Sequence, residues 1–291
     1  MQQEAGNQHS ERPVVLITGG SRGIGLELAK QFARNGHDLV LVARGKAHLE
    51  SASDSLAEEY GCTVTAIPMD LAADGAPIEL YRQVSKQGIR VEVLVNNAGI
   101  ADYGSFIDCD PQRLADVLQL NVLALTLLTR LFLPGMIERR RGRILNVASV
   151  LAFFAGAPNW AAYVASKQYV LGLTRSLRGE LRGSGVSATA LCPGPVATGF
   201  VDRSGVGHTR AYRWLPKVRP SNVARAGYRG TMAGRSCVVP GLLNKINAFL
   251  GELPPRGIAK GVLTFLLSPR PAVGPKGRQI DEEGSEGRRE K

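Results

Sequence analysis

Cysteine is scarce in this chain, and its four residues lie far apart in the sequence. Cys62, Cys109, Cys192 and Cys237 have neither the short spacings of a metal site nor the density of a disulfide-stapled domain. We therefore expect them to be reduced residues, mostly with a packing role, in a cytoplasmic protein.

Long apolar runs are also lacking. No stretch of sequence reaches the length that a bilayer-spanning helix needs. Residues 1–12 are polar and lack the apolar core of a signal peptide, so we expect them to form a disordered tail. These absences argue against a secreted or membrane-spanning protein and leave surface association as the remaining membrane contact.

Negative charge is in the minority. The chain has 36 Lys and Arg against 25 Asp and Glu, a formal net charge of +11. Such a balance favours an anionic partner, either the phosphates of a cofactor or acidic lipid head groups. Nucleic acid is the least supported partner, because the basic residues are scattered and no binding motif accompanies them. Simple solvation of the surface is the alternative explanation.

What the chain does contain is enough apolar material, 44% of 291 residues, for one large α/β domain. Short apolar runs typical of buried strands alternate with amphipathic stretches typical of helices, which predicts a doubly wound parallel sheet, the Rossmann fold. Strands are expected at 13–17, 38–43, 62–67, 91–95, 144–147, 186–192 and 236–239. Helices are expected at 26–36, 47–59, 78–86 and from an N-cap at Ser221 towards Met232.

A glycine-rich turn, TGGSRGIG, joins the first strand to the first helix. Gly19 and Gly23 would let the backbone approach a ligand closely, and Gly25 would allow tight packing of the helix. The helix N-terminus would then face a pyrophosphate. This context predicts a dinucleotide site.

The end of the second strand bears on cofactor choice. An enzyme that binds NAD usually has an acidic residue there, whereas this chain has Ala43 followed by Arg44. Arg22 in the glycine turn adds a second cation. Each arginine could simply be solvated, but together they favour the extra phosphate of NADP.

Tyr163 and Lys167 lie four residues apart, so on a helix both side chains leave the same face. An ammonium beside a phenol favours the phenolate and would lower the pKa of Tyr163 towards a useful acid/base range. Ser149, at the end of an apolar run, could hold a substrate oxygen against that phenol or could simply cap the strand end. The pair alone would be a weak signal.

Six motifs, in order, resemble those of the short-chain dehydrogenase/reductase family over about residues 13–200. The turn resembles the family's TGxxxGxG, and residues 96–99 resemble its NNAG segment. Asn121 in LQLNVLA resembles its helix asparagine. Ser149, with Tyr163 and Lys167, resembles its serine and YxxxK motif. The last match is the PG segment at 193–196, followed by Thr198.

The resemblance implies a role for each catalytic candidate. Tyr163 would exchange a proton with the substrate oxygen. Lys167 would lower the pKa of Tyr163 and bind the nicotinamide ribose, and Ser149 would position the oxygen. Asn121 would hold a water that links Lys167 to solvent, although it could instead bridge backbone in a kinked helix. The hydride comes from the cofactor, so no metal is required.

The same resemblance implies the cofactor contacts. Asp70 and Leu71 would contact the adenine, and Thr198 with the Val196 backbone would hold the carboxamide. For Asn96 we prefer a purely structural role that ties loops together. The complete set of cofactor-binding candidates is Gly19, Ser21, Arg22, Gly23, Ile24, Gly25, Arg44, Asp70, Leu71, Asn97, Ala98, Gly99, Tyr163, Lys167, Pro193, Gly194, Val196 and Thr198.

Residues 197–216 resemble the family's mobile substrate lid. Aromatic side chains around it would line an apolar pocket for a hydrophobic substrate, or would belong to the core. These are Phe153, Phe154, Trp160, Phe200, Tyr212 and Trp214.

The C-terminal part departs from the commonest family pattern. The catalytic domain is expected at 13–240, an apolar helical extension at 241–267 and a disordered tail at 268–291. The extension consists of two apolar segments separated by Pro254 and Pro255. It could rest on a membrane surface, cover a long apolar substrate, or pack against the domain or in a dimer interface.

The sequence therefore predicts an NADP-dependent oxidoreductase that reduces a hydrophobic ketone or ketoacyl compound and forms a homo-oligomer. Two alternatives remain at this point. One is a non-catalytic protein that senses the redox state of NADP, which would not need Ser149, Tyr163, Lys167 and Asn121. The other is a lipid-modifying reductase at a membrane surface.

Overall fold

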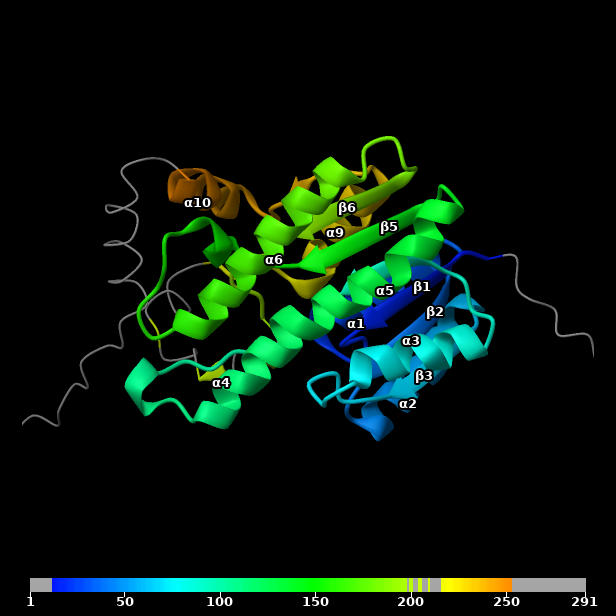
Figure 1. Cartoon of the computed structure of the whole chain (residues 1–291), viewed down its shortest axis with the longest axis horizontal. Coiled ribbons are helices and arrows are strands. Elements are labelled where there is room, and N and C mark those ends of the chain that lie inside the picture. Colours follow the sequence, from blue (N-terminus) through cyan, green and yellow to red (C-terminus); the bar gives the residue numbers. More distant parts are fainter. Residues whose placement is uncertain (1–11, 198, 201–203, 206–208, 210–215, 253–291) are drawn as a thin grey trace, which may run out of the picture.

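The computed structural model describes residues 12–197, 199–200, 204–205, 209 and 216–252. Within these residues, seven parallel strands form one sheet in the order β3-β2-β1-β4-β5-β6-β7, with helices on both faces (Figure 1). The predicted doubly wound parallel sheet is confirmed. The strands are β1 (Val14–Thr18), β2 (Asp38–Ala43), β3 (Val64–Pro68), β4 (Val91–Asn96), β5 (Gly142–Val147), β6 (Val186–Leu191) and β7 (Cys237–Val238).

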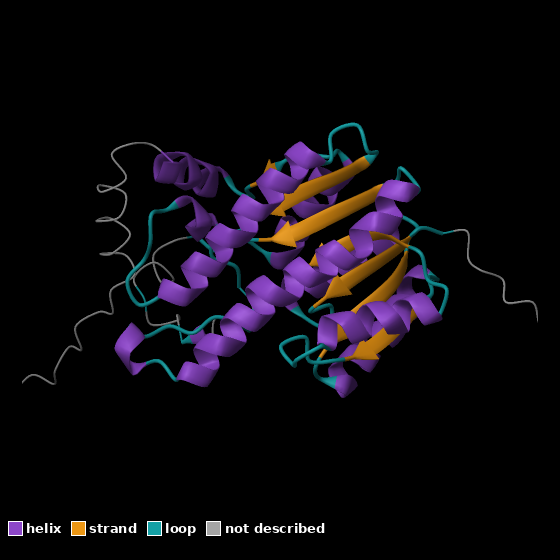
Figure 2. Cartoon of the chain, viewed as in Figure 1, coloured by secondary structure: helices purple, strands orange, loops and turns teal. Residues whose placement is uncertain are grey.

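The helices cover the sheet in two layers, visible as the purple ribbons around the orange arrows in Figure 2. Neighbouring residues of β1 point to opposite faces, so Val15 packs with α1, α2 and α9, and Leu16 packs with α3 and α5. Burial on both faces explains why the strand sequences are almost continuously apolar. The helices are α1 (Gly23–Arg34), α2 (Lys46–Tyr60), α3 (Ala76–Lys86), α4 (Pro111–Leu118), α5 (Leu125–Glu138), α6 (Ala161–Glu180), α9 (Pro220–Met232) and α10 (Leu242–Glu252).

The start of α9 differs from the prediction. Its N-cap is Arg219, and Ser221 lies inside the first turn, so the expected cap at Ser221 is wrong. Pro220 occupies the first helical position, where its fixed φ suits the helix and its missing N–H costs nothing. The proline therefore sets the boundary instead of a capping hydroxyl.

A continuous helical stretch, Pro111–Glu138, joins α4 and α5 through a π-helical segment, η2 (Gln119–Ala124). By length and composition it could cross a membrane, so the expectation that no stretch is long enough is wrong. Leu128, Phe132 and Met136 of this stretch are nevertheless buried against the sheet. Packing in the core accounts for its apolar character.

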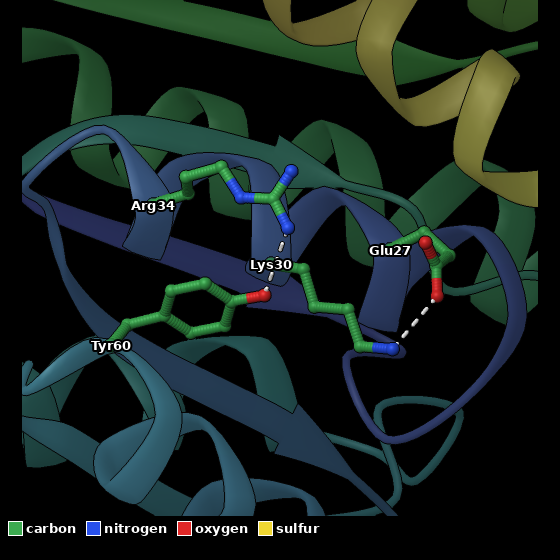
Figure 3. A network of polar contacts seen from close by, with 4 residues as sticks. All are labelled: Glu27, Lys30, Arg34 and Tyr60. Carbon is green, nitrogen blue, oxygen red and sulfur yellow. Dashed lines mark hydrogen bonds and ion pairs between the residues drawn. The ribbon is translucent and has the colours of Figure 1, made fainter.

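Polar contacts on the outer surface link α1 to the end of α2 (Figure 3). Glu27 and Lys30 form an ion pair of 3.0 Å within α1, and Arg34 donates a hydrogen bond of 3.4 Å to the Tyr60 hydroxyl at the end of α2. The ion pair is half-buried and the second contact is exposed, and surface contacts of these kinds contribute little to stability. The helices are held mainly by the core beneath them.

Helix α10 forms the first part of the C-terminal extension. Small residues turn towards the domain: a Cβ on Gly251 would lie 2.9 Å from the Phe153 carbonyl oxygen. The opposite face exposes Leu242, Leu243, Ile246, Phe249 and Leu250. This segment thus packs on the catalytic domain through one face only, and the second apolar segment lies outside the described residues.

Candidate active site

The glycine turn lies between β1 and α1. Gly19 and Gly23 have φ angles of +66° and +59°, which favour glycine, and a Cβ on Gly25 would lie 2.1 Å from the Gly19 carbonyl oxygen. The predicted tight packing at Gly25 is confirmed. Arg22 is the exposed N-cap of α1 and makes no side-chain cap. The first backbone N–H groups of this helix suit a bound pyrophosphate.

Two polar side chains hold this turn against the end of β4. The Thr18 hydroxyl accepts hydrogen bonds of 3.0 Å from the backbone N–H groups of both Asn97 and Ala98. Asn97 Nδ2 donates to the carbonyl oxygens of Thr18 (2.9 Å) and Gly19 (3.2 Å). The Asn97 amide therefore supports the turn. Thr18 was not among the predicted site residues. The sequence feature that could have indicated it is a hydroxyl at the end of a buried strand, because a buried hydroxyl needs a hydrogen-bond partner.

Asn96 is buried between strands. Its Nδ2 donates to the Thr129 hydroxyl (3.0 Å) and to Asn146 Oδ1 (2.9 Å). Its side chain therefore has a structural role, as preferred, but it links β4 to α5 and β5 and does not tie loops together.

Tyr163 and Lys167 project from α6 towards the end of β5. Lys167 Nζ lies 5.8 Å from the centre of the Tyr163 ring and donates a 2.8 Å hydrogen bond to the carbonyl oxygen of Val147. Ser149 follows β5, and its hydroxyl lies near enough to the Tyr163 hydroxyl to lower the pKa of that phenol. Its Oγ also accepts from the Leu151 N–H at 3.2 Å, capping the 3₁₀ turn η3 (Val150–Phe153). Ser149 thus serves as a cap and also contacts the phenol.

Burial dominates the protonation of this pair. It raises the pKa of Tyr163 to about 12, opposed by the hydrogen bond to Ser149. It lowers the pKa of Lys167 to about 8. The expectation that Lys167 brings the pKa of Tyr163 below its usual value is therefore wrong for this arrangement. Desolvation of the phenol is the stronger effect, and the ammonium hydrogen-bonds to backbone.

Asn121 lies in the π-helical segment η2. Its Oδ1 accepts from the Ile100 N–H (2.9 Å), and its Nδ2 donates to the Ile100 carbonyl (2.8 Å) and to the Ser166 hydroxyl (3.1 Å). The side chain of Asn121 therefore bridges backbone groups at an irregular helix, which is the alternative considered for this residue. Ser166, which donates to the Tyr163 carbonyl at 2.7 Å, was missed because its one signal is a position on the buried face of α6.

Gly99 connects the two halves of the site. A Cβ on Gly99 would lie 3.1 Å from Asn121 Oδ1 and 3.4 Å from Lys167 Nζ. Through Asn97, the same segment holds the glycine turn. The structure therefore brings the glycine turn, residues 96–99 and the Tyr163–Lys167 pair to the carboxyl edge of the sheet, where such sheets bind ligands.

The expected adenosine contacts lie at the ends of β2 and β3. Arg44 forms an exposed ion pair of 3.6 Å with Asp70. Leu71 is buried in the core, which leaves only its backbone for a ligand. Of the remaining candidates in the turn, Ser21 is half-buried and Ile24 packs on the core.

The segment after β6 closes the site from the other side. The Pro193 carbonyl accepts from the Val150 N–H (2.9 Å), and buried Val196 pairs with Val218 in an isolated bridge. Gly194 lies directly under Asn244 of α10, since a Cβ there would lie 2.2 Å from Asn244 Oδ1. Thr198 is outside the described residues.

The predicted aromatic pocket is only partly assembled. Trp160, Phe154 and Phe200 gather around Tyr163 with Tyr103. Phe153 instead packs in a separate cluster with Ala248 of α10, so its assignment to the pocket is wrong. Tyr212 and Trp214, like most of 197–216, lie outside the described residues.

Comparison with known proteins decides the family. The family description "short chain dehydrogenase" matches residues 13–206. The chain belongs to this family. As a short-chain dehydrogenase it is an oxidoreductase that binds a nicotinamide cofactor, and the positive-φ glycines, the packed Gly25 and the open N-terminus of α1 fit a dinucleotide.

Individual relatives of this short-chain dehydrogenase support the assignment. It is 36% identical over 184 residues to "Oxidoreductase UcpA" of Escherichia coli K12, covering 63% of this chain and 69% of that one. It is 37% identical over 203 residues to "Monensin polyketide synthase putative ketoacyl reductase" of Streptomyces virginiae (68% and 76%). Among solved structures, a short-chain dehydrogenase from Sphingobium yanoikuyae in complex with NADPH matches with a TM-score of 0.74 and 30% identity, covering 86% of this chain and 95% of that one.

Proposed function

We propose that this enzyme reduces a hydrophobic ketone or ketoacyl compound with NADPH, with Tyr163 as the proton donor. One observation carries the proposal: a buried phenol stands beside Ser149 and Lys167 at the ligand-binding edge of the sheet. A pKa of about 12 keeps Tyr163 protonated at neutral pH, so the phenol holds the proton that a donor must supply. Bound NADPH would supply the hydride.

The surroundings of Tyr163 favour an apolar substrate. Trp160, Tyr103, Phe154 and Phe200 pack around it and present mostly carbon surface. A relative named as a ketoacyl reductase is consistent with that class of substrate. Ser149, which lies next to the phenol, would hold the substrate oxygen beside the proton that is to be transferred.

A preference for NADP is supported by charge. The end of β2 carries Arg44 and no carboxylate, and Arg22 begins α1 at the glycine turn. Both arginines are exposed, and a guanidinium suits a phosphate ligand, which supports the proposed preference. The ion pair between Arg44 and Asp70 is solvent-exposed and weak, so it would not prevent Arg44 from binding the phosphate.

The function is tested by following NADPH absorbance with a panel of ketones and by the Tyr163→Phe variant. Loss of the phenolic proton should lower kcat by about a hundredfold or more. Affinity for NADPH, measured by fluorescence, should remain nearly unchanged. Tyr169→Phe makes the same change on the exposed side of α6, where the hydroxyl contacts Thr126, and should retain full activity. Full activity in Tyr163→Phe would contradict the assigned donor.

Failure of the wild type to oxidise NADPH with any ketone, despite tight binding, would favour the redox sensor. We regard that function as less supported, because a sensor has no need of the Ser149, Tyr163 and Lys167 cluster.

A second candidate function is that of a reductase which acts while bound to a membrane surface. The five exposed apolar residues of α10 form one helix face, and the net charge of +11 would favour acidic lipid. We propose this as a peripheral contact that would bring an apolar substrate to the enzyme. Assembly into a homo-oligomer and a cytoplasmic location stay predictions.

A further inference from the structure

Trp160 stands at the beginning of α6, three residues before the proposed proton donor. Its ring centre lies 4.8 Å from that of Tyr163 and 5.7 Å from that of Tyr103. Only 4% of the residue is exposed. The indole therefore forms a wall of the apolar cluster immediately beside the phenol.

The indole N–H of this wall has no hydrogen-bond partner. Trp160 Nε1 is one of two buried side-chain N or O atoms without a partner in the part of the chain that the structure describes. The other, Asn96 Oδ1, belongs to a side chain that already makes two hydrogen bonds through its Nδ2. Trp160 has a single polar atom, and a buried indole N–H normally finds a partner.

The backbone next to Trp160 makes a left-handed turn. Asn159 has a φ of +63°, in the left-handed region that asparagine adopts more readily than most residues with a side chain. Its carbonyl accepts from the Gly104 N–H at 3.0 Å, and its Nδ2 donates to the Tyr103 hydroxyl at 3.5 Å. These two hydrogen bonds fix the turn that leads into α6. Trp160 is thus fixed in place while its buried N–H has no partner.

The neighbours of Trp160 offer it little. Ala101, Ala157, Val164 and Phe200 present only carbon side chains. The hydroxyls of Tyr103 and Tyr163 belong to the same cluster, but neither accepts from the indole, and no other described residue does. An indole N–H can only donate, so it is free to pair with an acceptor that enters the site. A bound substrate can provide one, because the adjacent phenol is where the substrate oxygen is expected.

We propose that the Trp160 N–H binds a second oxygen of the substrate and thereby selects ketones that carry an acyl oxygen on the next carbon but one, as ketoacyl esters and thioesters do. The inference rests on the proposed ketone reduction and narrows its substrate class. A plain dialkyl ketone would leave the buried N–H unpaired. A site that hydrogen-bonds one group of its substrate rejects analogues that lack this group for the same reason. Trp160 would act in substrate binding and specificity, beside the chemistry of Tyr163.

The kinetic test compares two substrates in the wild type and in Trp160→Phe. Ethyl butyrylacetate has the second oxygen, and propyl pentyl ketone has the same chain length with methylene groups in place of the ester. The variant should lose about 10- to 100-fold in kcat/KM for the ketoester and less than about threefold for the ketone. The smaller ring lowers kcat/KM for both substrates. The ratio of the two kcat/KM values therefore reports the contribution of the N–H alone. An equal loss for both, or no loss, would overturn the proposal.

A second readout needs no turnover and leaves Trp160 itself unchanged. The chain has two tryptophans, so the indole N–H proton resonances of the wild type number two, and Trp214→Phe assigns the one from Trp160. With NADPH present, diethyl malonate, an unreactive diester, should shift the Trp160 resonance downfield, and propyl pentyl ketone should not. An unchanged resonance at saturating diester would mean that the N–H serves only packing or a bound water, and the proposal would fail. If the enzyme reduces no ketone, the proposed function fails, and this resonance still decides whether Trp160 binds the diester.

Discussion

At the scale of single residues, Lys167 holds a positive charge in a buried position, and burial disfavours charge. The side chain is 5% exposed, and burial lowers its pKa from the usual 10.5 to about 8. Among the residues that the structure describes, its hydrogen-bond partner is the Val147 carbonyl. Below pH 8 Lys167 remains protonated in the folded enzyme, and its buried charge lowers the stability of the fold. Residues that destabilise a protein in this way are expected where function needs them.

Lys167→Met should therefore stabilise the protein while impairing catalysis. The lowered pKa corresponds to a penalty of up to about 3 kcal/mol. Because the folded pKa is below the unfolded one, the penalty is complete below about pH 8 and disappears as the pH rises through 10.5. Urea unfolding of variant and wild type at pH 7 and pH 10 should show a gain at pH 7 that shrinks at pH 10. A variant less stable than the wild type at pH 7 would contradict this account.

Arg44 is the residue on which the cofactor preference turns. Arg44→Asp should lower kcat/KM for NADPH by about 10- to 100-fold, because a charge-assisted contact to phosphate is replaced by repulsion. The value for NADH should fall much less or rise. Asp70→Asn, which removes the partner carboxylate of Arg44, should keep the preference for NADPH. An unchanged preference in Arg44→Asp would mean that another group binds the phosphate.

At the scale of elements, the turn between β1 and α1 depends on close packing. Gly25→Ala places a methyl group 2.1 Å from the Gly19 carbonyl oxygen, so the turn must move. We expect a loss of about 1–3 kcal/mol in stability and a marked loss of NADPH affinity.

Gly172 provides the matched control for that change. It lies on the exposed side of α6, and a Cβ there meets nothing within 4 Å. Gly172→Ala should raise the free energy of unfolding by about 0.5–1 kcal/mol through helix propensity alone. Denaturant unfolding and cofactor fluorescence measure both variants, and similar results for the two would refute the packing argument.

The elements also show what sequence reasoning can and cannot supply. β2 was predicted with its observed bounds, because a strand buried on both faces is continuously apolar and punctuated by turns. The π-helical turn at Asn121 and the bonds of Thr18 and Ser166 depend on which elements meet, which a linear pattern does not contain. The direction of the Tyr163 pKa shift was missed for the same reason, since it depends on burial by residues distant in the sequence.

At the scale of the whole molecule, α10 lies beside α6 and carries an apolar face (Figure 1). Phe249 is 65% exposed, and Leu242 is 76% exposed. A surface of this kind is expected to contact another body.

The membrane proposal predicts that the full chain sediments with vesicles containing phosphatidylglycerol and much less with neutral vesicles. Ile246→Glu combined with Phe249→Glu should reduce the bound fraction by about tenfold or more, because charge enters the apolar face. Leu118→Glu, at an exposed leucine away from α10, is the control and should bind as the wild type does. Equal binding by all variants would exclude α10 as the contact.

The contact between Gly194 and Asn244 has a consequence for how this enzyme can change over generations. Any side chain at position 194 would occupy the space of the Asn244 amide, which itself donates to the Pro240 carbonyl. Mutations at the two positions should be strongly non-additive. In a library evolved for new substrates, a larger residue at 194 should survive only when 244 has first become smaller, so the order of the two steps is set in advance.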